Sequence, residues 1–136
     1  MNANGVRWLD IPKILDERGN LSFIEKGADL KFDIQRVYWI YDVPGGEIRG
    51  GHAFKVQKEI IIALSGSFEV VLHNGATSDR YSLNRSYKGL YVPEMVWRHM
   101  ENFSTNAVCL VLASTFYSEE DYIYDFETFV NLTQAK

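Results

Sequence analysis

The sequence contains one cysteine and no long apolar run. Cys109 cannot form a disulfide within the chain, which excludes a disulfide-stapled domain and fits a reducing compartment. It stands in the apolar run Ala107–Ala113 and is expected to be a small buried hydrophobe. No stretch approaches the ~20 apolar residues of a membrane span, and Met1–Gly5 lacks the basic and apolar regions of a signal peptide. We therefore expect a soluble cytoplasmic protein with no membrane partner.

Basic segments, repeats, low-complexity stretches and linkers are also missing. Fourteen Lys and Arg residues against eighteen Asp and Glu residues give a net charge of −4. Because no basic cluster could follow a phosphate backbone, we expect no nucleic-acid partner. A length of 136 residues leaves room for one core, so a single domain over residues 1–136 is predicted.

The chain does contain many short apolar runs, rich in β-branched and aromatic residues and separated by turn-forming residues. The pair Asn74-Gly75 predicts a tight hairpin, because both residues tolerate positive φ. Strands are predicted at Val6–Leu9, Leu21–Glu25, Gln35–Asp42, Ile60–Leu64, Ser67–Leu72, Ser78–Leu83, Gly89–Val92, Val96–Met100 and Ala107–Ser114.

Only the tail changes character. From Ser118 onward the apolar residues have helix-like spacing, with Ser118 as the expected N-cap. Many short strands without β-α-β alternation predict an all-β fold, an antiparallel β-barrel of the double-sheet jelly-roll kind with a short C-terminal helix. In the run 36–41, alternation places Arg36, Tyr38 and Ile40 on one face and Val37, Trp39 and Tyr41 on the other, and we expect both faces to be covered.

One segment has the spacing of the first cupin motif, and a second motif follows with departures. The matching positions are Gly46, His52, Glu59 and Gly66, and then Pro93, Met95, Arg98 and Asn102. Phe54 and Arg98 stand where a metal-binding cupin has its second and third histidines. Phe donates no lone pair and a guanidinium repels a cation, whereas a divalent ion needs several converging ligands. We therefore predict a cupin without metal or other cofactor.

Further segments make the chain similar to the sugar 3,4-ketoisomerases, the WxcM-like cupin family. They are Asp16–Gly19, Arg36–Tyr38, Arg49–Ala53, Val96-Trp97, Leu112–Ser114 and Glu120–Ile123. The resemblance implies a homodimer that converts dTDP-4-keto-6-deoxyglucose to its 3-keto isomer, ahead of transamination for surface polysaccharide. Dimerisation also has a physical reason, since the strand 35–42 and the N-terminal strand would otherwise have unpaired edges.

Ketone migration requires a base at C3, a donor for the enediolate oxygen and a proton for C4. His52 suits the base, because an imidazole with a pKa near ~6.5 is available near neutral pH. Tyr38 is a candidate proton donor or shuttle. Arg36 and Arg49 are expected to hold diphosphate or enolate oxygens, because guanidinium groups match phosphate geometry.

The other candidate residues have simpler interpretations beside the functional one. Glu59 is either a hydrogen-bond acceptor in the pocket or a solvated carboxylate at a strand end. Arg18 and Arg98 could be surface charges, although the resemblance places both near the sugar. Trp97 is a candidate for an aromatic wall of the pocket. His99 should face away from Arg98, because neighbouring residues on a strand face opposite sides.

Phe54 replaces a second histidine that the resemblance associates with proton relay. Tyr38, His99 or water could substitute for it, or the enzyme could be slower or altered. This departure keeps two alternatives open, namely a non-catalytic cupin that binds a dTDP-sugar or related saccharide, and an epimerase or lyase on a similar nucleotide sugar.

Overall fold

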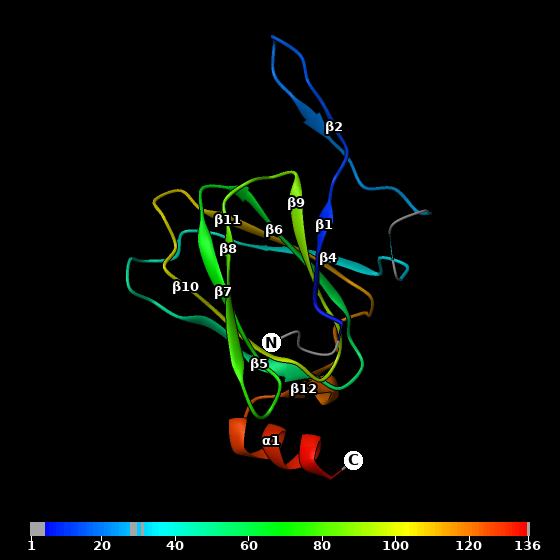
Figure 1. Ribbon diagram of the computed structural model, residues 1–136, viewed down its shortest axis with the longest axis vertical. Helices are drawn as coiled ribbons and strands as arrows, with labels where there is room; N and C mark the ends of the chain where they lie inside the picture. Colours follow the sequence, from blue (N-terminus) through cyan, green and yellow to red (C-terminus); the bar gives the residue numbers. More distant parts are fainter. Residues whose placement is uncertain (1–4, 28–29, 31, 136) are drawn as a thin grey trace.

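The computed structural model describes residues 5–27, 30 and 32–135 (Figure 1). Most of Met1–Gly5, the segment in which we looked for the features of a signal peptide, lies outside the described residues. The elements in chain order are β1 (Arg7–Asp10), β2 (Lys13–Ile14), β3 (Leu21–Ser22), β4 (Arg36–Ile40), β5 (Arg49–Phe54), β6 (Glu59–Ser65), β7 (Phe68–His73), β8 (Ser78–Leu83), β9 (Lys88–Val92), β10 (Trp97–Glu101), β11 (Val108–Ala113), the 3-10 helix η1 (Glu119–Asp121), β12 (Tyr122–Ile123) and α1 (Phe126–Gln134).

Two five-stranded antiparallel sheets form the body of the protein. Their strand orders are β1-β9-β6-β11-β4 and β12-β5-β10-β7-β8, while β2 and β3 form a separate hairpin. Successive strands therefore cross repeatedly between the sheets, which confirms the all-β double-sheet fold with a short C-terminal helix. Within the described residues the two sheets share no hydrogen-bonded strand pair, so the barrel is not closed by a continuous ladder. The predicted hairpin at Asn74-Gly75 joins β7 to β8.

The core fills the space between the sheets. Alternate residues of β6, such as Ile61 and Ala63, face Val70, Leu72 and other apolar side chains of the second sheet. Cys109 is fully buried in this layer, as predicted. The intervening residues Ile60 and Ile62 pack on the other side against a smaller cluster that includes Leu9 and Leu112. Strand β6 is therefore apolar on both faces because both faces are covered.

The prediction that both faces of the strand at 36–41 are covered is wrong for a single chain. Val37, Trp39 and Tyr41 are 46%, 58% and 59% exposed. The reason is that β4 is the edge strand of its sheet, and its outer face lies beyond the segment that covers β6.

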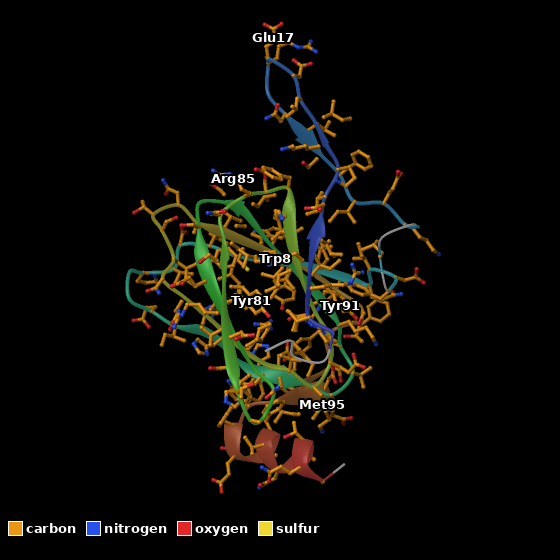
Figure 2. All side chains as sticks on the ribbon, in the orientation of Figure 1. Trp8, Glu17, Tyr81, Arg85, Tyr91 and Met95 are labelled. Carbon is orange, nitrogen blue, oxygen red and sulfur yellow. The ribbon has the colours of Figure 1, made fainter. Side chains whose placement is uncertain are left out.

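The chain departs from the predicted elements at both ends. Hairpin β2–β3 projects from the body, and Glu17 lies at its outer tip (Figures 1 and 2). In the tail, Ser118 makes no side-chain cap, and the helix begins instead after Asp125, which accepts a bond from the Thr128 amide. The short strand β12 precedes it and pairs with β5. No helix in the described part of the chain is long and apolar enough to cross a membrane.

Candidate active site

A cavity of about 480 Å³ opens between the two sheets beside the C-terminal segment. It is lined by Arg36, Tyr38, Trp39, Ile40, Arg49, Gly50, Gly51, His52, Arg98, Tyr117, Tyr122 and Tyr124. A smaller hollow of about 170 Å³ lies between residues 9–12 and 23–26, and its lining contains no histidine. The larger cavity therefore gathers the groups that acid–base chemistry requires.

Strand alternation aims the functional side chains into this cavity. Arg98 is 1% exposed and lies opposite His52 in the β5–β10 pairing, so the two meet on the inner face. Gly50, with φ +74°, makes room for them, because a Cβ at this position would lie 2.6 Å from an Arg98 nitrogen. The neighbours of Arg98 face outward, and His99 lies 3.4 Å from Glu101.

A buried ion pair forms the floor of the cavity. Arg98 Nε lies 2.6 Å from Glu59 Oε2, although the angle is not that of a hydrogen bond, and a second guanidinium nitrogen donates to Glu59 Oε1 at 2.9 Å. Burial alone would lower the pKa of Arg98, but the neighbouring Glu59 carboxylate, followed by Tyr38, outweighs burial and raises that pKa. Both residues of the pair are 1% exposed, so Glu59 is not a solvated carboxylate.

Tyr38 joins this ion pair through its hydroxyl. The hydroxyl donates to Glu59 Oε1 at 2.7 Å and accepts from Arg98 at 2.9 Å. Burial, followed by the negative charge of Glu59, raises the Tyr38 pKa far above its usual value. The phenol is therefore a fixed neutral group at the edge of the cavity, with its proton directed at a carboxylate.

Gln57 is a buried residue behind the cavity that the sequence analysis missed. Its amide nitrogen donates to Glu59 at 3.0 Å, and its amide oxygen accepts from Arg36 at 2.8 Å and from Thr115 at 2.7 Å. This network fixes Arg36 while leaving the buried Arg36 Nε without a protein partner. The sequence signal that could have identified Gln57 is its spacing, since it lies two residues before Glu59, just ahead of the same strand.

His52 occupies an apolar wall of the cavity. Its ring centroid lies 4.8 Å from that of Phe54 and 5.0 Å from that of Tyr122, and its buried Nε2 has no hydrogen-bond partner. Burial and then the positive charges of Arg98, Arg36 and Arg49 lower the His52 pKa to about 3. The imidazole is therefore neutral at ordinary pH, and it is one of the side chains that line the cavity.

This shift predicts how the reaction depends on pH. Because His52 stays neutral in the free protein, kcat/KM should show no acid limb from it between about pH 5 and 8, where an ordinary imidazole titrates. As the pH falls, His52 becomes protonated in the unfolded chain at a higher pH than in the folded protein. The free energy of unfolding should therefore also fall as the pH drops from 6.5 towards 3. Initial rates at low substrate across this range test the first statement, and an acid limb centred near 6.5 would contradict it.

Three tyrosines of the tail complete the wall, and the sequence analysis missed all of them. Tyr122 and Tyr124 stack with centroids 5.2 Å apart, and Tyr117 lies under the Arg36 guanidinium at 5.4 Å. They reach the cavity because β12 pairs with β5, at Tyr122 opposite Phe54. No sequence signal identified this pairing, because the tail had the spacing of a helix.

Two of the predicted site residues lie elsewhere in a single chain. Trp97 packs on α1, with its ring 5.3 Å from Phe126 and 5.9 Å from Phe129, because it faces the side of β10 opposite Arg98. Arg18 lies in the projecting hairpin with a side chain 89% exposed, paired with Asp16 at 2.8 Å. The cavity brings together the other predicted residues: His52, Tyr38, Arg36, Arg49 and Arg98, with Glu59 directly behind them.

The donor set at the cavity contains one imidazole among three guanidinium groups. In the described part of the chain, no group of three or more His, Cys, Asp or Glu side chains is arranged to hold a metal ion.

Comparisons with known proteins agree over nearly the whole chain. Residues 4–134 match the family described as FdtA: WxcM-like, C-terminal. Over 121 residues the chain is 40% identical to the TDP-4-oxo-6-deoxy-alpha-D-glucose-3,4-oxoisomerase of Aneurinibacillus thermoaerophilus, covering 89% of this chain and 87% of that protein.

Two solved structures share the fold closely. A 3,4-ketoisomerase from Helicobacter canadensis superposes with a TM-score of 0.92 at 38% identity, covering 96% of this chain and 98% of that one. A histidine-to-asparagine mutant of the 3,4-ketoisomerase QdtA from Thermoanaerobacterium thermosaccharolyticum, in complex with TDP-4-keto-6-deoxyglucose, gives a TM-score of 0.95 at 34% identity, with coverages of 98% and 96%.

Proposed function

Because the chain belongs to the WxcM-like, C-terminal family, we propose that it is a sugar-nucleotide 3,4-ketoisomerase that converts dTDP-4-keto-6-deoxyglucose to the 3-keto isomer. The observation that carries this proposal is the neutral, unpartnered His52 imidazole at a cavity lined by three guanidinium groups. The curated relative and the solved structures are named for the same reaction class.

The geometry supplies a group for each step of ketone migration. His52 takes the C3 proton. The negative charge that develops on O4 of the enediolate is assigned to the Arg98 guanidinium, which Glu59 and the Tyr38 hydroxyl already orient. Because this guanidinium is fixed before substrate arrives, it stabilises the charge without reorganising during the reaction.

Arg36 and Arg49 are assigned to the diphosphate. Both line the cavity, and Arg36 has a buried nitrogen without a protein partner. Arg98 is less suited to the diphosphate because Glu59 already neutralises it. A bound diphosphate would partly cancel the positive charges that hold down the His52 pKa, so substrate binding makes His52 a stronger base.

Proton exchange in deuterated water tests this function directly. With dTDP-4-keto-6-deoxyglucose as substrate, we expect the 3-keto product to form. NMR of the ring protons follows both this product and the exchange of ring hydrogen for deuterium. Binding of the sugar nucleotide without exchange or product would favour a non-catalytic cupin, the alternative that Phe54 keeps open because it replaces a second histidine. Exchange without ketone migration would favour an epimerase.

We also infer a homodimer in which Arg18 contributes to the site of the second copy. The exposed face of Val37, Trp39 and Tyr41 is too apolar for water alone, and the β2–β3 hairpin exposes Ile14 and other apolar side chains far from its own body. Because Arg18 does not line the cavity of its own chain, an approach from a partner is the arrangement that would place it near a sugar.

The oligomeric state should respond to a charge on this face. The native protein is expected to have twice the 15.7 kDa chain mass by light scattering. Trp39→Glu should shift it toward the monomer, since a charge would be buried in the interface, whereas Glu47→Gln at the exposed turn before β5 serves as the control. A monomeric native protein would contradict the proposal.

For the cellular context, we propose a cytoplasmic enzyme of surface-polysaccharide biosynthesis, in one cupin domain over residues 1–136. The buried free thiol of Cys109 fits a reducing compartment. The 3-keto product carries its carbonyl at C3, which is where a transaminase would need it to form a 3-amino sugar.

A further inference from the structure

The connection 55–58 links β5 in one sheet to β6 in the other. Its residues belong to neither strand, so their backbone amides lie outside both ladders and need other partners. Asp121, in the C-terminal segment, accepts from three of them. Its backbone oxygen accepts from Lys55 at 3.0 Å, and its carboxylate oxygens accept from Val56 at 2.8 Å and Gln57 at 3.1 Å. Because two of these bonds go to a charged acceptor, Asp121 holds the connection firmly in one conformation.

The conformation of this connection determines where the Gln57 side chain lies. Gln57 is buried, and its amide has one orientation that satisfies its neighbours, because a guanidinium only donates and a carboxylate only accepts. Its oxygen therefore accepts from Arg36 at 2.8 Å, and its nitrogen donates to Glu59 at 3.0 Å. A shift of the Gln57 backbone would disturb both contacts, so Gln57 connects Asp121 to the charged groups of the cavity.

The Arg36 guanidinium depends on Gln57 for its orientation. It lies 5.0 Å from the centroid of the Tyr38 ring and 5.4 Å from that of Tyr117, and such ring contacts attract the cation without directing its N–H groups. The Gln57 oxygen directs one of these groups. Because that acceptor is a neutral amide and not a carboxylate, Arg36 is oriented without being neutralised and keeps its charge for a diphosphate.

We propose that Asp121 is a positioning residue for the sugar nucleotide, which acts through the connection 55–58 and Gln57 to hold Arg36 in its diphosphate-binding orientation. This inference rests on the proposed ketoisomerase function and deepens it. Asp121 does not line the cavity, so it acts only through these other residues. A misaligned Arg36 weakens binding of the substrate and of the transition state alike. Loss of Asp121 should therefore raise KM and leave kcat nearly unchanged.

Asp121→Asn in the intact protein is the main test. The asparagine side chain keeps one acceptor oxygen, but it presents an NH₂ group, which cannot accept, to the other backbone amide. The dissociation constant for dTDP, measured by calorimetry, should rise about tenfold, as should KM for dTDP-4-keto-6-deoxyglucose, while kcat stays within about threefold. An unchanged dissociation constant, or a fall in kcat at constant KM, would overturn the inference.

Asp125→Asn is the matched control. Asp125 is also an aspartate of the C-terminal segment whose carboxylate accepts from a backbone amide, that of Thr128 at 2.9 Å, and it caps α1 outside the cavity. This variant removes the same charge and a similar bond, so it should lower the thermal stability and leave the dissociation constant for dTDP unchanged. If Asp125→Asn weakened dTDP binding as much as Asp121→Asn, a general loss of stability would explain both effects and the inference would fail.

Gln57→Met tests the same connection from its other end, and it also serves if Asp121→Asn fails to fold. Methionine keeps the length of the side chain and removes both amide contacts, and the same weakening of dTDP binding is expected. Since both substitutions act on one contact to Arg36, the double variant should bind dTDP within about threefold of the weaker single variant. Effects that multiply in the double variant would show that Asp121 does not act through Gln57.

Binding and turnover separate this inference from the function on which it rests. The dissociation constant for dTDP requires no turnover. A native protein that binds dTDP but forms no 3-keto product would reject the ketoisomerase function, while the comparison of the variants would still decide the role of Asp121. A native protein that does not bind dTDP would overturn both.

Discussion

His52→Asn is expected to abolish isomerisation while leaving the fold intact. Asparagine is polar and of similar size, but its amide cannot accept the C3 proton, so the rate should fall by about 10²–10⁴-fold. The fold should survive because the His52 ring nitrogen Nε2 makes no hydrogen bond that the substitution would break. Product formation by NMR measures the first effect, and circular dichroism with thermal unfolding measures the second.

His99→Asn provides the matched control for this experiment. It removes an imidazole from the outer face of β10, next to Glu101 and outside the cavity, so the rate should be unchanged. A His52→Asn protein that kept more than about a tenth of the native rate would show that another group abstracts the proton.

The inner faces of the strands were predictable because their alternation is regular. The pattern in β4 placed Arg36 and Tyr38 together, and the separation of Arg98 from His99 follows from the same two-residue period. The motif spacing then placed His52 and Glu59 on consecutive strands of the chain, β5 and β6, which lie in facing sheets. These residues needed only local geometry and the motif spacing to be placed.

The tyrosine wall and the position of Trp97 depend on long-range pairing. Tyr122 reaches His52 because two residues of the tail pair with β5, a contact that joins positions more than sixty residues apart. Trp97 was assigned to the pocket from its ring chemistry alone, although alternation from Arg98 turns it toward α1. Ring type indicates what a residue could bind, whereas strand period decides whether it faces the ligand.

Burial of the Arg98–Glu59 pair leads to the other large expected effect. Arg98→Met leaves the Glu59 carboxylate 1% exposed without its cation, and this should lower the free energy of unfolding by about 3–5 kcal/mol. Urea unfolding followed by tryptophan fluorescence measures the loss. Lys88→Met breaks the exposed pair with Asp10 and should cost at most about 1 kcal/mol, so it controls for removal of a surface charge.

The double variant Glu59→Leu with Arg98→Met separates stability from activity. Because two apolar side chains of similar volume leave no unpaired buried charge, most of the lost stability should return. Activity should not return, since Tyr38 then lacks both the acceptor and the donor that orient its hydroxyl, and the enediolate loses its cation. If the double variant recovered both, the ion pair would be only a structural support. Recovery of stability alone would mean that the protein keeps a costly buried pair because the reaction needs a fixed positive charge beside His52.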